Sequence, residues 1–139
     1  MASSSSKAST SKKLAQTVAR MAGDKKAQDI VILDMRQMVN FCDFFVIATG
    51  TSDRHAQAIA QGIEDELTEQ GMKLNLGRGI KPMSGARSSS EHGVWVLLDM
   101  VDIVVHIFEP NAREFYALEH LWQDAPQEAY KPKVRKKTT

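Results

Sequence analysis

Helical spacing of apolar residues predicts two helices in the first half of the chain. An apolar stripe over residues 11–22 predicts a short amphipathic helix, and Gly23 marks its end. A second stripe follows the hydroxyl groups of residues 50–52, which are suited to capping a helix, and Gly71 marks the end of that helix. The apolar face of the second helix consists of Ala56, Ile59, Ala60, Ile63 and Leu67. We expect both helices to cover a sheet.

Strand-like patterns occur between and after these helices. Residues 30–33 and 44–48 are continuous apolar runs, which are typical of strands buried on both faces. Apolar and polar positions alternate from residue 72 to 76, as in a strand with one face in the core. Residues 77–93 have no apolar periodicity and predict a long loop, either functional or a tolerated insertion. Buried strands followed by helices indicate an α/β fold with a single domain.

Two apolar stretches around an Asp-Met-Val-Asp turn predict a β-hairpin over residues 94–108. We expect Met100 and Val101 to form its loop. The pairs predicted from this loop are Asp99 with Asp102, Leu97 with Val104 and Trp95 with His106. One face of the hairpin is then wholly aliphatic and belongs to the core.

The opposite face of the hairpin combines an aromatic residue, a histidine and paired acids. Such a mixture is expected of a docking surface that has an anchor and charged specificity groups. The residues that we predict to bind a partner are Trp95, Asp99, Asp102, Val104 and His106. In the alternative interpretation Trp95 and His106 pack beneath a helix, and the two aspartates serve the turn.

The C-terminal part of the chain predicts one more helix and a tail. Asn111, with Glu114 three residues later, is a helix-start signature, and Pro126 ends the helix. Its apolar stripe, which we expect in the core, consists of Phe115, Leu118 and Trp122. The predicted division of the chain is a disordered tail at 1–10, a folded domain at 11–125 and a basic disordered tail at 126–139. The basic tail is either merely solvated or adds salt-sensitive contacts to an RNA partner.

Composition narrows the class of protein. A length of 139 residues suits one domain, and a net charge of +1 gives no overall attraction to nucleic acid or membrane. Cys42 is the single cysteine, so an intrachain disulfide is excluded and a reducing compartment is favoured. The Ser- and Lys-rich residues 1–13 lack the apolar run of a signal peptide, although transit peptides share their shortage of acids. We expect a cytoplasmic protein.

The sequence does not support catalysis or a cofactor. It has no Cys pair and no His-Glu-x-x-His motif, and its histidines are scattered over different predicted elements, so we expect no metal and no cofactor. The turn at residues 50–52 joins a strand to a helix and would aim backbone N–H groups at a phosphate. Candidate anion-binding residues are Ser52, Arg54 and His55. In the alternative interpretation Ser52 only caps the helix and the other two are only exposed.

A nucleotide-binding or nucleotidyltransferase-like module is therefore the alternative function. Two-metal transfer requires carboxylates that converge on one point. The nearest acidic cluster, residues 64–66, occupies consecutive helix positions and fans outward. We therefore predict that the protein is not an enzyme.

Four segments resemble the ribosomal silencing factor family, which is also called the Iojap-related family. They are residues 27–34 (AQDIVILD), 43–55 (DFFVIATGTSDRH), 95–108 (WVLLDMVDIVVHIF) and 113–122 (REFYALEHLW). Several long strings in one order are far more specific than a short motif. The resemblance implies a mixed β-sheet flanked by α-helices, with a topology similar to nucleotidyltransferases but without their catalytic acids.

The resemblance also implies a function. Members of the family bind the large ribosomal subunit through its protein number fourteen and block docking of the small subunit, which represses translation when nutrients are short. The implied mechanism is steric exclusion, so occupancy and not chemistry produces the effect. An exposed apolar face makes a homodimer of the free protein a further expectation.

Three departures from the family pattern concern single segments. Val101 stands where the family usually has Gly, and a β-branched residue resists the positive φ of a type I′ turn. Residues 77–79 replace a usual Glu-Gly, and the loop that follows looks longer. Cys42 replaces a usual Thr.

Overall fold

Among the described residues of the computed structural model, six strands form one mixed sheet, in the order β3-β4-β5-β2-β1-β6. They are β1 (Gln28–Asp34), β2 (Phe44–Thr49), β3 (Ala86–Ser90), β4 (Gly93–Asp99), β5 (Ile103–Phe108) and β6 (Gln127–Ala129). The central strands β2 and β5 pair in parallel, and every other pair is antiparallel. The structure describes residues 2–69, 86–90, 93–100 and 102–130. The predicted mixed sheet flanked by helices is confirmed.

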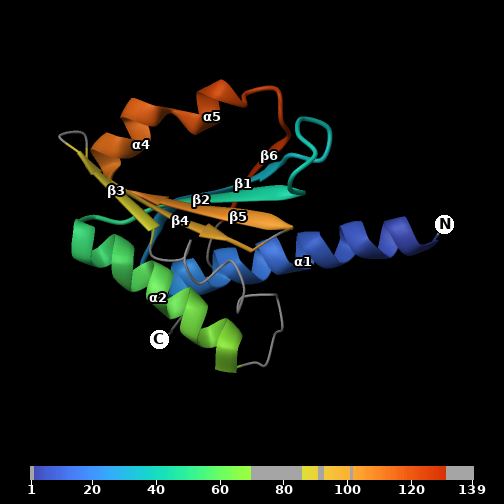
Figure 1. Ribbon diagram of the computed structural model, residues 1–139, viewed down its shortest axis with the longest axis horizontal. Helices are drawn as coiled ribbons and strands as arrows, with labels where there is room; N and C mark the ends of the chain where they lie inside the picture. The colour runs from blue at the N-terminus through green and yellow to red at the C-terminus, as the bar shows by residue number, and fades with distance from the viewer. Residues whose placement is uncertain (1, 70–85, 91–92, 101, 131–139) are drawn as a thin grey trace, which may run out of the picture.

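Helices cover both faces of this sheet (Figure 1). The helices α1 (Ala2–Asp24) and α2 (Asp53–Glu69) lie on one face, and α4 (Pro110–Tyr116) and α5 (Leu118–Leu121) lie on the other. Each face therefore has its own apolar core. We call the cluster beneath α1 and α2 the first core and the cluster beneath α4 and α5 the second core.

Both helices of the first core show the predicted apolar stripes. All five residues predicted for α2, from Ala56 to Leu67, are buried. Along α1 the stripe of Leu14, Val18 and Met21 is also buried. The helix itself begins at Ala2, so it runs through residues that the sequence assigned to a tail. The predicted end of α2 at Gly71 lies outside the described residues, as does the strand predicted at 72–76.

The hairpin of β4 and β5 has the predicted faces but a different register. Trp95 pairs with Phe108 and Leu97 pairs with His106, so the predicted pairing was wrong by two residues. The backbone N–H of Met100 donates to the carbonyl of Ile103 at 2.9 Å, so Met100 pairs with Ile103. Met100 is therefore not part of the loop, which begins one residue later than predicted. A shift of two keeps every side chain on its face because strand side chains alternate with a period of two.

Several other predictions need correction at the edges of the domain. Residues 86–90, which were expected in a loop, form β3 and pair with β4, and residues 127–129 form β6 against β1. The C-terminal helix begins with Pro110 after Glu109, and Asn111 does not cap it. Ala117, at φ 46°, divides it into α4 and α5. Phe115, which we expected in the core, is exposed.

Close approach of strand to helix fixes the start of α2. A Cβ atom on Gly50 would lie 2.8 Å from both the Cα and the backbone N of Ala56. The backbone N–H of Gly50 also donates to the carbonyl of Phe108 at 2.9 Å, so this segment is held to β5 as well. Neither the sheet nor the helix can move away without breaking other contacts.

We predict that Gly50→Ala lowers the free energy of unfolding by about 1 to 3 kcal/mol, because the methyl group clashes with backbone atoms. Gly62→Ala is the matched control. The three atoms nearest to its added Cβ all belong to the side chain of Lys25, which can rotate away, and alanine is favoured inside a helix. Urea denaturation followed by circular dichroism measures both variants. Equal unfolding midpoints for the two variants would contradict this account of Gly50.

Candidate functional site

The mixed face of the hairpin lies over the second core. Val104 and His106 are buried there, while Trp95, Asp99 and Asp102 are each partly exposed. The structure thus brings four of the five predicted partner-binding residues to one face and the fifth, Asp102, to the adjoining turn, but at two depths. Only the three partly exposed residues reach the surface of the protein.

Six aromatic side chains form a continuous row through this region, which we call the aromatic band. Its members in spatial order are Phe41, Phe45, His106, Trp95, Tyr116 and Phe115, with neighbouring ring centroids 6.5, 4.6, 5.9, 4.6 and 5.0 Å apart. The middle of the band is buried, since His106 is only 5% exposed. The two ends are open, since Phe41 is 61% and Phe115 54% exposed. Aromatic rings at these spacings attract each other beyond their simple burial.

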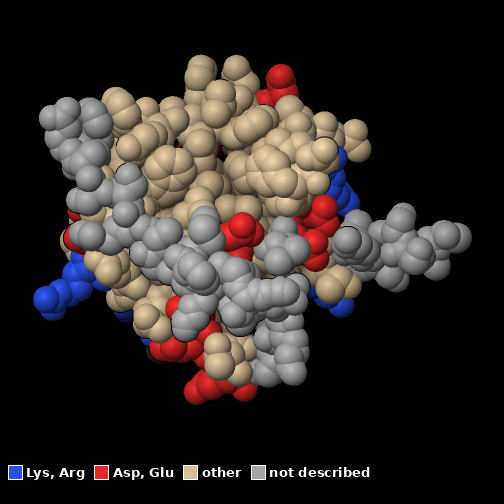
Figure 2. Space-filling model, in the orientation of Figure 1, with Lys and Arg blue, Asp and Glu red and all other residues tan. Residues whose placement is uncertain are grey.

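The surface over α4 and α5, at the Phe115 end of the band, carries little charge. In Figure 2 the region over α4 and α5 is mostly uncharged, and acidic side chains lie beside it. Leu121 on α5 is a further exposed apolar residue of this side, at 65%. Exposed apolar side chains on a weakly charged surface are common where a protein binds another macromolecule.

Three carboxylates gather at the turn end of the hairpin. Burial first, and then the charges of Asp43, Asp99 and Asp102, raise the pKa of Cys42 to about 12. Backbone N–H of Asp43 donates to the carbonyl of Asp102 at 2.7 Å, which holds the start of β2 beside the hairpin turn. We call these three residues the acidic end. Cys42 is a buried thiol that stays protonated at neutral pH, so it packs rather than reacts.

His106 is the buried polar centre of the aromatic band. Its Nδ1 accepts a hydrogen bond from the indole Nε1–H of Trp95 at 3.2 Å. Burial lowers the pKa of His106 to about 4, so the ring is neutral at physiological pH. Among the described residues its Nε2 has no hydrogen-bond partner. The imidazole therefore holds the indole as a neutral acceptor.

The three candidate anion-binding residues are mostly engaged within the fold. Ser52 Oγ accepts the backbone N–H of His55 at 3.1 Å, which is an N-cap contact. His55 accepts the backbone N–H of Thr51 at Nδ1, 2.8 Å away, and its Nε2 contacts the carbonyl of Lys25 at 2.8 Å. Arg54 is exposed beside them. Both ring nitrogens of His55 are therefore engaged with backbone groups and are not available to bind an anion.

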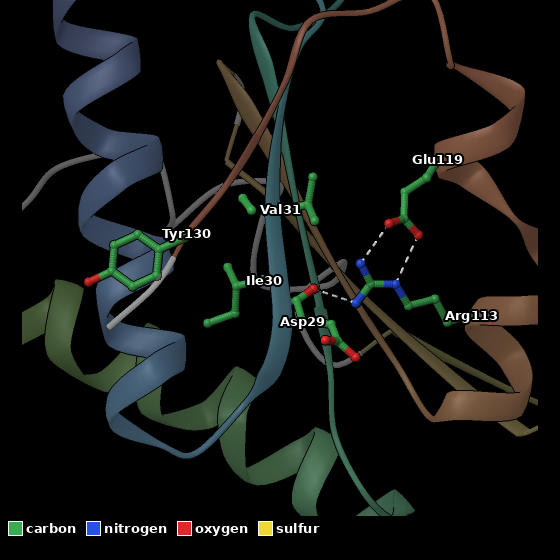
Figure 3. Close-up of a pocket in the computed structure, with 7 residues that line it drawn as sticks. Asp29, Ile30, Val31, Arg113, Glu119 and Tyr130 are labelled. Atoms are coloured by element: carbon green, nitrogen blue, oxygen red, sulfur yellow. Dashed lines mark hydrogen bonds and ion pairs between the residues drawn. The ribbon is translucent and has the colours of Figure 1, made fainter. Parts of the chain in front are cut away.

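Sequence reasoning missed Arg113, which joins its own helix α4 to three other elements. Its guanidinium binds the carboxylate of Glu119 through two bonds of 2.9 and 2.8 Å. It also donates to the carbonyl of Asp29 at 2.6 Å and to Thr49 Oγ1 at 2.7 Å. Figure 3 shows this arginine beside a cleft of about 460 Å³ between β1 and α5. Because its donors serve the fold, Arg113 secures the α4–α5 bend, and no local sequence signal marks such a role.

Metal and membrane sites are not indicated by the part of the chain that the structure describes. No three His, Cys, Asp or Glu side chains in these ranges are grouped to hold a metal ion. No helix among the same residues combines the length and apolar character that crossing a bilayer requires.

The depressed pKa of His106 predicts how stability depends on pH. The unfolded chain takes up a proton near pH 6.5, whereas the folded chain does so only near pH 4. The contribution of neutral, buried His106 is therefore complete above pH 6.5 and falls as the pH approaches 4, by about 3 kcal/mol in total. Urea titrations at several pH values should show a steeper loss for the wild-type protein than for His106→Phe. Parallel losses between pH 6.5 and 4 would contradict the assignment.

Comparisons with known proteins agree on one family. The family model described as "Ribosomal silencing factor during starvation" matches residues 8–139. Ribosomal silencing factor RsfS of Bacillus subtilis is 39% identical over 115 residues, which span 83% of this chain and 89% of that protein. Protein Iojap, chloroplastic, of Zea mays is 37% identical over 111 residues, 80% of this chain and 44% of that protein.

Solved structures support the same conclusion. A crystal structure of a Chromobacterium violaceum protein matches with a TM-score of 0.63 and 29% identity, covering 80% of this chain and 85% of that one. A Bacillus halodurans structure matches with a TM-score of 0.59 and 33% identity, covering 84% of this chain and 97% of that one. Sequence and fold thus point the same way over most of the chain, which belongs to the ribosomal silencing factor family.

Proposed function

We propose that this protein docks onto the large ribosomal subunit through the subunit's protein number fourteen and sterically prevents the small subunit from joining. Translation is thereby repressed under nutrient limitation. The observation that carries the proposal is the open part of the aromatic band next to the acidic end, on a face of the sheet that the helices cover only in part. Family membership supplies the ribosome as the partner.

The aromatic band supplies the apolar part of the contact. Trp95 is partly exposed and packs against Tyr116 at 4.6 Å and Phe108 at 5.1 Å. Such packing restricts the indole before a partner arrives, so little side-chain entropy remains to be lost on binding. Aromatic residues in this situation are the usual anchors of protein interfaces.

The acidic end supplies the charged part. Asp99 and Asp102 are partly exposed. Asp99 lies on the same face of the hairpin as Trp95, and Asp102 lies in the adjoining turn, close enough to Cys42 to act on it together with Asp99. Ribosomal proteins are surrounded by RNA and generally expose basic residues, so these carboxylates would favour one orientation of the partner and speed its encounter. Val104 and His106 lie below this surface and contribute by supporting it.

In this proposal the protein acts by occupancy, without an enzymatic step, metal or cofactor. Bound at the joining face, a protein of 15.5 kDa occupies space that the small subunit requires. The degree of repression then follows from the concentration of the protein relative to its dissociation constant. The proposal also includes a cytoplasmic location, contacts of the basic tail with ribosomal RNA, and self-association of the free protein.

We predict that Asp99→Lys weakens binding to isolated large subunits at least tenfold, because a cation would face a basic partner. Asp65→Lys is the control, since Asp65 is exposed on α2, on the far side of the sheet. Co-sedimentation of each purified variant with large subunits measures the affinity, and circular dichroism verifies that each is folded. If folded Asp99→Lys binds as tightly as Asp65→Lys, the proposed docking surface is wrong.

A further inference from the structure

The indole of Trp95 has its only polar atom directed into the protein. Nε1–H donates to His106 Nδ1 at 3.2 Å, and His106 is 5% exposed. The indole also packs against two rings, since Phe108 and Tyr116 lie 5.1 and 4.6 Å away between centroids. The partly exposed remainder of the side chain therefore consists of carbon atoms.

The environment of His106 suits the role of an acceptor and little else. Because Nδ1 accepts the indole proton, the proton of the neutral imidazole lies on Nε2. That nitrogen is buried and has no hydrogen-bond partner among the described residues. A buried N–H without a partner is unfavourable, and a phenylalanine in the same aromatic surroundings would avoid it. A histidine here is therefore less favourable for packing than a phenylalanine would be. Within the described part of the chain, the one hydrogen bond of its ring is with Trp95.

We propose that His106 is a positioning residue for docking: it holds the Trp95 indole with its N–H turned inward, so that the partner meets a fixed, purely apolar edge of the ring. This inference rests on the proposed function, because it assigns the chemistry of the same docking surface. The complementary group on the partner is an aliphatic side chain or the stem of a basic one, not a hydrogen-bond acceptor. The affinity for the partner should therefore depend on the orientation of the ring and not on a hydrogen bond between the indole N–H and the partner.

The first test uses the free protein. In the ¹⁵N-labelled wild-type protein, the Trp95 indole N–H resonance, assigned by its absence in Trp95→Phe, should be protected from exchange with solvent. In His106→Phe it should shift and exchange faster, because the acceptor is gone. In His106→Asn, whose amide oxygen can take the place of Nδ1, protection should return in part. An indole resonance that is unchanged in folded His106→Phe would overturn the inference.

The second test is a double-mutant cycle of binding to isolated large subunits. His106→Phe should weaken binding up to about tenfold, the range of one hydrogen bond. In the Trp95→Phe background, where no indole N–H exists, the same change should have no further effect. Equal weakening in both backgrounds would show that His106 acts only through general packing, and would overturn the positioning role.

Failure of the proposed function is distinguishable from failure of this inference. If the wild-type protein does not bind large subunits, the proposed function fails, and the indole resonance in the free protein alone decides whether His106 holds Trp95. If the wild type binds but the cycle is additive, the proposed function stands and the positioning role fails.

Discussion

The two central strands, β2 and β5, carry buried side chains on both faces, and the remainder of the domain follows from covering them. All six residues of each strand are buried, and they pair in parallel from Phe44 with Ile103 to Thr49 with Phe108. Their burial requires a layer on either side of the sheet. One layer is made of the long helices α1 and α2, and the other of the short α4 and α5, seven and four residues long. The shorter layer leaves part of the second core near the surface.

This unequal coverage explains why one face can serve both as core and as docking surface. The buried centre of the aromatic band, at Phe45 and His106, is continuous with exposed rings at Phe41 and Phe115. A partner that covers the open ends would extend an existing core instead of creating a new one. The sheet beneath is held by its hydrogen bonds, so the surface is largely formed before binding, which reduces the entropic cost of association.

The sequence predicts best where burial imposes a period. The α2 stripe from Ala56 to Leu67 is found buried because a helix over a sheet repeats its apolar positions at helical spacing. The two faces of the hairpin are predicted correctly because burial of one face imposes a period of two on its strands. Its register is not, because alternation fixes only which face a residue occupies, and the position of the turn at residues 100–102 depends on local backbone geometry.

The edge strands of the sheet and its long-range polar contacts cannot be predicted in this way. Both β3 and β6 lie at the edges of the sheet, and neither ARSSS nor QEA has an apolar pattern. The bend at Ala117 is not signalled by a glycine, and the residue that secures it, Arg113, bonds to groups as distant in sequence as Asp29. The exposed fractions of Trp95 and His106 likewise depend on how far α4 and α5 extend over them. The alternation of residues along the strands carries no information about the length of those helices.

The most direct test of steric exclusion is light scattering during the association of purified ribosomal subunits. Large subunits are incubated with increasing amounts of the protein before small subunits are added, at constant salt and magnesium concentrations. Our account predicts that the amplitude of the scattering increase falls with occupancy, with a midpoint equal to the dissociation constant measured with large subunits alone. An undiminished amplitude at concentrations that saturate the large subunit would contradict it.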